Sequence, residues 1–266
     1  MALPVLSNVT APLRVFTVKL LVVSAPLFDC AMVPLSTVDV KVRFLRPVLK
    51  ASVMAMLPPV RTRLACVVVA YLIGSLSFAV IVSRMMGLQD PRTYGSQNPG
   101  ATNVLRSGSK AAAVVTLLLD AVKGWVPVFA VQRLPGMGEG ADAVLAACAL
   151  AAFAGHVWPV FFRFKGGKGV ATAAGVLFGL EPWLGLATMA TWLIVAYFSR
   201  YSSLAAVASA VFAPAFYLLG ARVVWSGAPV IALAIGAMSA VLLYRHKDNI
   251  ARLIAGKESR IGSKSS

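Results

Sequence analysis

Long apolar runs separated by short polar segments dominate the chain from residue 64 onward. Seven runs stand out, at residues 64–86, 110–132, 143–162, 170–180, 183–198, 203–220 and 229–244. A helix needs about 20 apolar residues to cross the hydrocarbon core of a bilayer. The fourth run is short, so it must be tilted, partial or re-entrant and covered by protein. The pattern predicts an all-α, polytopic membrane protein with about seven transmembrane helices.

The composition supports this class. Hydrophobic residues make up 59% of the 266 residues, and only 13% are charged, whereas soluble domains carry roughly 25% charged residues. The mean hydropathy is +0.82. A soluble fold would have to bury every apolar run, which would leave no polar surface.

The charge distribution predicts the orientation. The formal net charge is +16, and cytoplasmic segments of membrane proteins retain Lys and Arg. With seven spans and a cytoplasmic C-terminus, nearly all basic residues after residue 64 lie inside, and the outside loops hold only Arg133 and Arg222. Because aromatic residues do not alternate with the basic ones, no nucleic-acid partner is predicted.

The first sixty residues do not fit this scheme. The apolar stretch 15–26 is too short to span, prolines interrupt it, and the basic residues of this region would lie outside. We expect residues 1–60 to be a leader, and 61–266 to be the membrane domain. The leader is either amphipathic or disordered, or it reflects a misread upstream start with the protein beginning at Met54 or Met56. The second interpretation is favoured.

Three segments at the predicted cytoplasmic face combine Gly, Asn and basic residues. In residues 164–172, the glycines allow successive N–H groups to converge on an anion, and the loop leads into a helix N-terminus. Lys165 and Lys168 add positive charge. The segment is not a Walker A loop, because Gly169 follows Lys168 where Ser or Thr is required. An ordinary basic turn is an equally good interpretation of this segment alone.

The other two segments are less specific. Residues 95–106 supply short polar side chains, and Arg106 offers a planar fork for phosphate oxygens; turns and a helix cap at Thr102 or Asn103 are the alternative. Residues 244–258 include basic residues that anionic lipid headgroups would attract. His246, Asn249 and Glu258 are not needed for that role.

Ionisable side chains also lie inside the predicted spans. Asp120 and Lys123 are three residues apart, so they can pair on one helix face, and such groups at membrane depth serve either function or structure. His156 is interpreted mainly as a packing residue; the alternative is that it reaches the site, because Lys165 follows only nine residues later. The cysteines Cys30, Cys66 and Cys148 are far apart and the chain has two histidines, so we predict no disulfide, no metal site and no cofactor.

Taken together, the segments resemble the bacterial membrane-integral acyl-phosphate:glycerol-3-phosphate acyltransferase family from about residue 71 to 262. The matching blocks are Gly74-Ser75, 95–106, 119–124, Gly155-His156, 165–172 and 246–258. The chain departs from the family at Gln97, where the family often has Gly. The resemblance implies transfer of an acyl group from acyl phosphate to the sn-1 hydroxyl of glycerol 3-phosphate, giving 1-acyl-glycerol 3-phosphate and phosphate. It also implies an active site on the cytoplasmic side of the inner membrane.

The resemblance and the residue chemistry together predict the site. The catalytic candidates are Ser75, Ser96, His246 and Asn249. The substrate-binding candidates are Asn98, Asn103, Arg106, Lys123, Lys165, Gly166, Gly167, Lys168, Gly169, Thr172 and Glu258. The substrates and the lipid bilayer are the expected partners. A transporter of small phosphorylated anions is the main alternative, but the two halves show no duplication; an assembly subunit would not require three anion-type segments.

Overall fold

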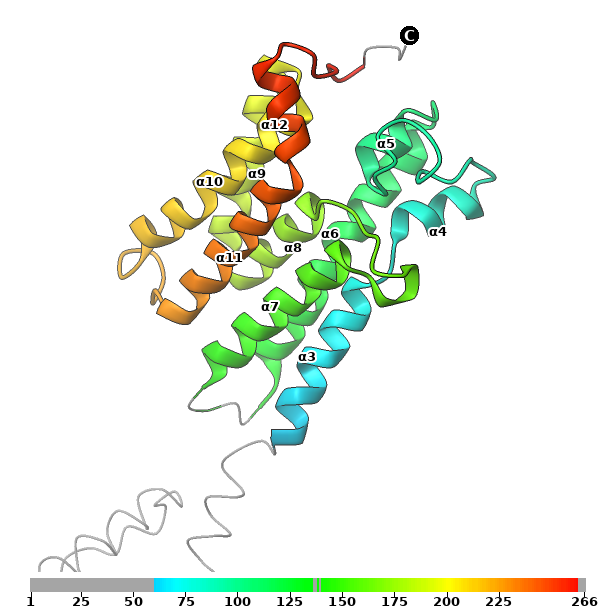
Figure 1. Cartoon of the computed structure of the whole chain (residues 1–266). Helices are drawn as coiled ribbons and strands as arrows, with labels where there is room; N and C mark the ends of the chain where they lie inside the picture. Colours follow the sequence, from blue (N-terminus) through cyan, green and yellow to red (C-terminus); the bar gives the residue numbers. More distant parts are fainter. Residues whose placement is uncertain (1–59, 136–137, 139, 263–266) are drawn as a thin grey trace, which may run out of the picture. The chain divides into compact units, whose positions relative to one another are not determined.

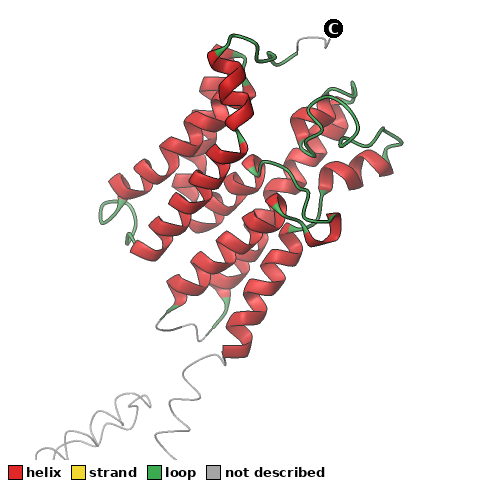
Figure 2. Ribbon diagram, in the orientation of Figure 1, coloured by secondary structure: helices red, strands yellow, loops and turns green. Residues whose placement is uncertain are grey.

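The computed structural model describes residues 60–135, 138 and 140–262, and these residues form helices and loops without a strand (Figure 2). The predicted leader lies outside the described residues except for Val60, so that assignment stays a prediction. The described helices are α3 (Val60–Gly74), α4 (Phe78–Met85), α5 (Ala101–Leu105), α6 (Lys110–Arg133), α7 (Ala141–Val157), η2 (Val160–Phe162), α8 (Val170–Leu180), α9 (Pro182–Ser199), α10 (Ser202–Gly220), α11 (Pro229–Arg245) and α12 (Lys247–Ile254).

The helices from α6 to α11 form a bundle within the compact unit that begins at Arg61 (Figure 1). One end of the bundle carries α4, α5, the loop before α8, and α12. The opposite end carries the beginning of α3, the end of α6, the beginning of α7, and the connections from α8 to α9 and from α10 to α11. The segments predicted to be cytoplasmic therefore share one end of the molecule.

Span lengths confirm a multi-pass protein. Within the described residues, four helical segments are long and apolar enough to cross a bilayer individually: Lys110–Arg133, Ala141–Phe162, Pro182–Ser199 and Ser202–Gly220. Two bent helix pairs also pass the length and composition test when taken together, α3 with α4 at 45° and α11 with α12 at 57°. With the short α8, all seven predicted apolar runs are helical.

The first predicted span, 64–86, is not one continuous helix as the sequence suggested. It breaks between α3 and α4, where the Nζ of Lys123 donates a hydrogen bond of 2.6 Å to the carbonyl of Leu76. Ser75 is fully buried and its hydroxyl donates to the carbonyl of Tyr71 at 2.8 Å. Irregular backbone inside a membrane protein needs such partners, because lipid offers none.

The short helix α8 is covered by protein, as predicted. Its 11 residues extend only about 16 Å at 1.5 Å per residue. A Cβ atom on Gly175 of α8 would overlap the carbonyl of Ala121 on α6, and one on Gly124 of α6 would overlap the carbonyl of Thr172 on α8. Reciprocal glycines let the two backbones touch, and this contact fixes the N-terminus of α8 and the loop before it.

Candidate active site

The glycine loop, residues 165–169, lies directly on the end of α7. A Cβ atom on Gly166 would overlap the carbonyl of His156, and one on Gly167 would overlap the Nε2 atom of the same residue. Gly169 has φ +87° and is the N-cap residue of α8, a conformation that favours glycine. The sequence therefore needs glycine here for close approach as well as for backbone conformation.

This loop presents unpaired N–H groups. Within residues 60–135, 138 and 140–262, no acceptor is found for the backbone N–H groups of Lys168 and Gly169. The first N–H groups of α8 also have no partner within their helix, and the helix dipole places positive potential there. Lys168 is half-buried beside them, whereas Lys165 is exposed. The arrangement suits a phosphate group.

The C-terminal segment meets the glycine loop through Lys168. The Nζ of Lys168 donates to the side-chain oxygen of Asn249, whose Nδ2 donates to Glu258 at 2.6 Å. Arg252 donates to the other Glu258 oxygen at 2.7 Å. The pKa of Lys168 is lowered to about 8, mainly by burial and also by nearby arginines, while Glu258 opposes the shift. Burial tends to raise the pKa of Glu258, but hydrogen bonds, first from Asn249, hold it below its usual value.

His246 lies at the junction between α11 and α12, just past the membrane-spanning part of α11. It is only 3% exposed, and its Nδ1 donates to the carbonyl of Leu242 at 2.8 Å. Because Nδ1 carries the hydrogen, Nε2 holds the lone pair of the neutral ring. Burial lowers the pKa of His246 to about 4, and the charge of Lys168 contributes in the same direction. The ring is thus neutral at pH 7 and able to accept a proton.

The first polar segment is held together by Asn103. Its Nδ2 donates to the carbonyls of Pro91 at 2.6 Å and Tyr94 at 3.1 Å, and its Oδ1 accepts from the backbone N–H of Ser96 at 3.0 Å. Asn103 therefore ties residues 91–96 to α5 rather than capping a helix, because Gly100 is the N-cap residue of α5. The side chain of Asn103 therefore stabilises the loop through its hydrogen bonds. Ser96 is exposed and Asn98 is half-buried.

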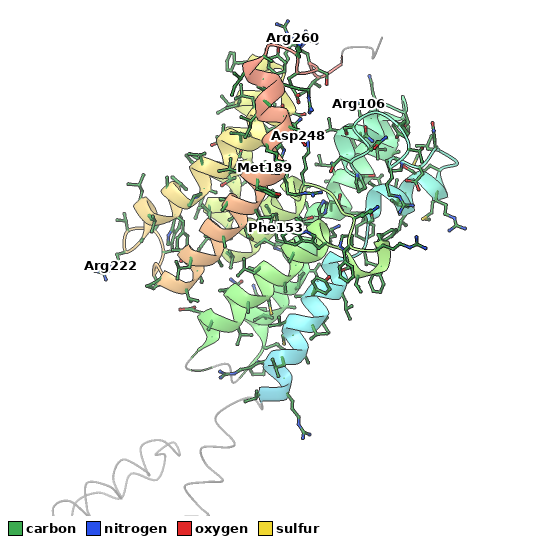
Figure 3. The ribbon with its side chains drawn as sticks, in the orientation of Figure 1. Arg106, Phe153, Met189, Arg222, Asp248 and Arg260 are labelled. Atoms are coloured by element: carbon green, nitrogen blue, oxygen red, sulfur yellow. The ribbon has the colours of Figure 1, made fainter. Side chains whose placement is uncertain are left out.

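Arg106 connects this segment to the C-terminal one. Its guanidinium donates to Asn103 Oδ1 at 3.3 Å and to the hydroxyl of Ser259 at 2.9 Å. Figure 3 labels Arg106 beside α5. A hollow of about 500 Å³ lies beside it, lined by Gly87, Leu88, Gln89, Tyr94, Gly95, Arg106 and Ser107. Through Arg106 and Lys168, all three predicted segments are joined at one end of the bundle.

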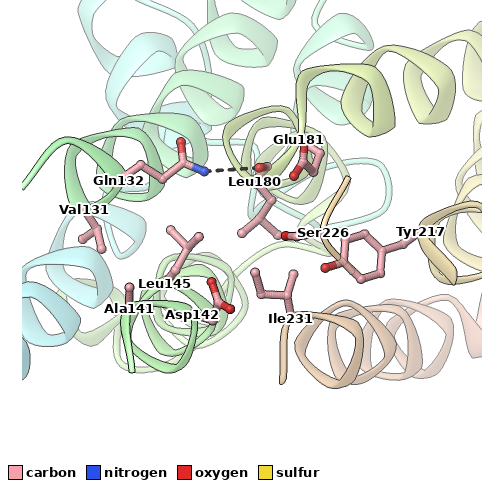
Figure 4. Close-up of a pocket in the computed structure, with 10 residues that line it drawn as sticks. All are labelled: Val131, Gln132, Ala141, Asp142, Leu145, Leu180, Glu181, Tyr217, Ser226 and Ile231. Atoms are coloured by element: carbon pink, nitrogen blue, oxygen red, sulfur yellow. Dashed lines mark hydrogen bonds between the residues drawn. The ribbon is translucent and has the colours of Figure 1, made fainter. Parts of the chain in front are cut away.

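A second hollow, of about 270 Å³, lies at the opposite end of the bundle. Its lining includes the carboxylates of Asp142 and Glu181 and the ring of Tyr217 (Figure 4). Two carboxylates repel an anionic ligand, so this hollow does not suit a phosphorylated substrate.

A buried polar cluster lies behind the glycine loop. The Nζ of Lys123 is 2.7 Å from Asp120 Oδ1, which confirms the predicted pair. His156 Nδ1 shares a hydrogen bond of 3.0 Å with Thr172 Oγ1 and is 3.7 Å from Asp120 Oδ1, so the ring has polar partners as a packing residue would, while its Nε2 lies against Gly167. Lys123 thus has protein partners in the bundle interior, apart from the three joined segments. Thr172 ends the second segment, and its hydroxyl is bonded to His156. Their proposed contacts with substrate, like that of Ser75, stay predictions.

Sequence reasoning missed three residues that the structure brings to the site. Arg245 and Arg252 are not among the predicted site residues; both belong to the basic segment 244–258. Arg245 donates to the carbonyls of Gly166 and Gly167, Arg252 holds Glu258, and Ser259 accepts from Arg106. A general signal existed, since planar Arg forks suit buried oxygen acceptors better than Lys does.

Fold and site define a multi-pass membrane protein with an anion-binding surface at one end of its helix bundle. Comparison with known proteins gives the family: the sequence model described as glycerol-3-phosphate acyltransferase matches residues 64–256. The chain belongs to this family and is an integral membrane acyltransferase, in agreement with the resemblance found in the sequence.

Close relatives cover nearly the whole membrane domain. The glycerol-3-phosphate acyltransferase of Bordetella pertussis is 57% identical over 215 residues, covering 80% of this chain and 99% of the relative. That of Albidiferax ferrireducens is 62% identical over 204 residues, covering 76% and 90%.

Two solved structures share the fold. The glycerol 3-phosphate form of PlsY (YgiH), an integral membrane glycerol 3-phosphate acyltransferase, has a TM-score of 0.69 at 37% identity and covers 76% of this chain and 96% of its own. The lysophosphatidic acid form has a TM-score of 0.67 at 36% identity with the same coverage.

Proposed function

We propose that the protein transfers a fatty acyl group from acyl phosphate to the sn-1 hydroxyl of glycerol 3-phosphate, forming 1-acyl-glycerol 3-phosphate and phosphate. The main support is that three cationic segments converge at one end of the bundle. Hydrogen bonds from Lys168 to Asn249 and from Arg106 to Ser259 join them. Both proposed substrates carry phosphate. The solved relatives are described with glycerol 3-phosphate and with lysophosphatidic acid, the acceptor and the product of this reaction.

The proposed chemistry is a direct acyl transfer. The sn-1 oxygen forms an ester bond with the acyl carbon, the bond from that carbon to the phosphate oxygen breaks, and phosphate leaves with the electron pair. The hydroxyl proton passes to a base, either Nε2 of His246 or a phosphate oxygen of a substrate. No cysteine nucleophile is needed, since phosphate is already a good leaving group.

We assign the two substrates to different residues of the joined segments. The glycine loop with Lys165 and Lys168 holds the acyl phosphate, and Arg106 and His246 hold the glycerol phosphate. Lys123, also predicted to hold the glycerol phosphate, is bonded to Asp120 and Leu76 in the bundle interior, so its role stays a prediction. Ser75, Ser96 and Asn249 orient the reacting groups and stabilise the developing oxyanion. Asn249 is the best supported of these three, because it contacts Lys168 directly.

The activity test uses the purified full-length chain in detergent with labelled glycerol 3-phosphate and palmitoyl phosphate, palmitoyl-CoA or no donor. Labelled lysophosphatidic acid formed only from palmitoyl phosphate supports the proposal. Product from the CoA ester would overturn the donor assignment, and a folded protein without product from either donor would point to transport of phosphorylated anions. A chain that begins at Met56 tests the leader, which is expected to be dispensable.

We also propose that the chain lies in the bacterial inner membrane with the three segments in the cytoplasm. The test places single cysteines at Lys247 and Arg222, which are at opposite ends of the bundle, in a variant without the native cysteines. A membrane-impermeant thiol reagent applied to spheroplasts should label the cysteine at 222 and reach the one at 247 only after permeabilisation. The reverse pattern would overturn the orientation.

A further inference from the structure

Arg245, the last residue of α11, is connected to the backbone of the glycine loop. Its guanidinium donates to the carbonyls of Gly166 at 3.0 Å and Gly167 at 3.3 Å. On the other side of the loop, the N–H of Gly167 donates to the carbonyl of His156 at 3.2 Å. The loop is thus held between α7 and α11, and Arg245 is its only side-chain donor in the hydrogen bonds of the described residues.

This contact sets the direction of the neighbouring N–H groups. Within a planar trans peptide, the C=O of one residue and the N–H of the next point in opposite directions. Because the carbonyl of Gly167 points to Arg245, the N–H of Lys168 points away from it. That N–H is one of the groups without an acceptor beside the N-terminus of α8. Arg245 therefore turns a loop amide toward the space where an anion would bind.

Arg245 also brings a charge that no carboxylate neutralises. Ion pairs in the described part of the chain join Asp or Glu to Arg92, Lys123, His156 and Arg252, and none includes Arg245. Its Nε–H is buried without an acceptor. The C-terminal dipole of α11 favours a cation at this position but supplies no partner for Nε. The guanidinium, bonded to the loop carbonyls and without a carboxylate partner, therefore adds positive potential to the neighbouring anion site.

We infer that Arg245 is a positioning residue for phosphate binding: it clamps the carbonyls of Gly166 and Gly167 so that the loop amides face the phosphate of a substrate, and it contributes positive charge to that site. This inference rests on the proposed function, in which the glycine loop holds acyl phosphate. It assigns a role to a residue outside the predicted site and makes the end of α11 part of the phosphate site.

The test compares Arg245→Gln with the wild type in two assays. In the first, thermal unfolding of the full-length protein is followed as inorganic phosphate is added. Loss of the charged donor should raise the half-saturating phosphate concentration about 10- to 100-fold. This readout needs no turnover, so it tests the inference even if the proposed reaction fails. Lys247→Gln removes a neighbouring exposed charge that lies over Tyr244 and should leave phosphate affinity unchanged.

In the second assay, steady-state kinetics separate KM from kcat. Arg245→Gln should raise KM for acyl phosphate by a similar factor while KM for glycerol 3-phosphate changes less than about 3-fold. A selective rise for glycerol 3-phosphate would support the positioning role and assign the loop to that substrate. If Arg245→Gln does not fold, Arg245→Lys, which keeps the charge but not the fork, should weaken phosphate binding by a smaller factor. Wild-type phosphate affinity in either folded variant would overturn the inference.

Discussion

Lys168 links the activity of the protein to pH. Its pKa is lowered from 10.5 to about 8, mainly by burial, while the proposed role requires the charged ammonium. We therefore expect kcat/KM to fall on the basic side with an apparent pKa of about 8. Bound phosphate favours the charged form, so the corresponding limb of kcat should lie at higher pH.

Deprotonation of Lys168 should lower activity but raise the stability of the folded protein. The folded protein releases this proton near pH 8 and the unfolded chain near pH 10.5, so the unfolded chain binds more protons between these values. Stability then rises with pH across that window. At 1.36 kcal/mol per pKa unit, the charged ammonium costs the fold up to about 3 kcal/mol at neutral pH. Activity and stability should therefore diverge above pH 8.

The assay measures kcat/KM and the midpoint of thermal unfolding across this pH range, with donor hydrolysis in the absence of enzyme subtracted. Lys168→Gln should lose most activity, remain in the membrane and lack both pH effects, whereas Lys247→Gln should keep them. A basic limb near pH 8 that persists in Lys168→Gln would refute the assignment to this ammonium. So would activity that stays constant through pH 8 in the wild type.

Three further predictions concern packing and charge. Gly175→Ala should destabilise the contact between α6 and α8 by about 1–3 kcal/mol, measured by thermal unfolding, whereas Gly236→Ala, with nothing within 4 Å of the added Cβ, should not destabilise. Asp120→Leu should cost about 3–5 kcal/mol because it leaves the Lys123 ammonium buried without its carboxylate. Replacing both as Asp120→Leu with Lys123→Met should recover only part of that loss, because the Leu76 carbonyl then lacks its Lys123 donor; a double variant no more stable than the single one would contradict a structural pair. Arg106→Gln should raise KM for glycerol 3-phosphate about 10-fold or more, whereas Ser259→Ala should change this KM less than about 3-fold. Equal effects of the two substitutions would indicate that Arg106 acts only by holding the C-terminal segment.

The membrane fold was largely predictable because bilayer thickness sets the length of apolar runs. The break in the first span was not. Ser75 and Ser77 interrupt an otherwise apolar run, and serine is common in transmembrane helices, so the local pattern favours continuity. The partner of the free carbonyl is Lys123, 47 residues further along the chain. A break stabilised by a distant side chain leaves no periodic signal in the sequence.

The contacts that join the three segments of the site were also not predictable from the sequence. Residues 244–258 suggested a basic tail at a membrane surface, yet Glu258 returns to Asn249 and Arg252, and Ser259 reaches Arg106 across 153 positions of sequence. Local spacing predicts which side chains share a helix face, as it did for Asp120 and Lys123. It does not predict which loop ends meet when the bundle closes.

The roles of individual basic residues are the least predictable feature of the site. The preference for Lys and Arg on the cytoplasmic side explains every cation in these segments equally well, so it cannot distinguish a retained charge from a ligand-binding one. Lys165 and Lys168 belong to the same loop, but Lys165 is exposed whereas Lys168 is half-buried against Asn249. Arg245 and Lys247 differ in the same way, since only Arg245 holds the glycine loop. Desolvation is what separates these pairs: a cation that loses water beside unpaired N–H groups needs an anion, whereas a hydrated cation two or three residues away does not.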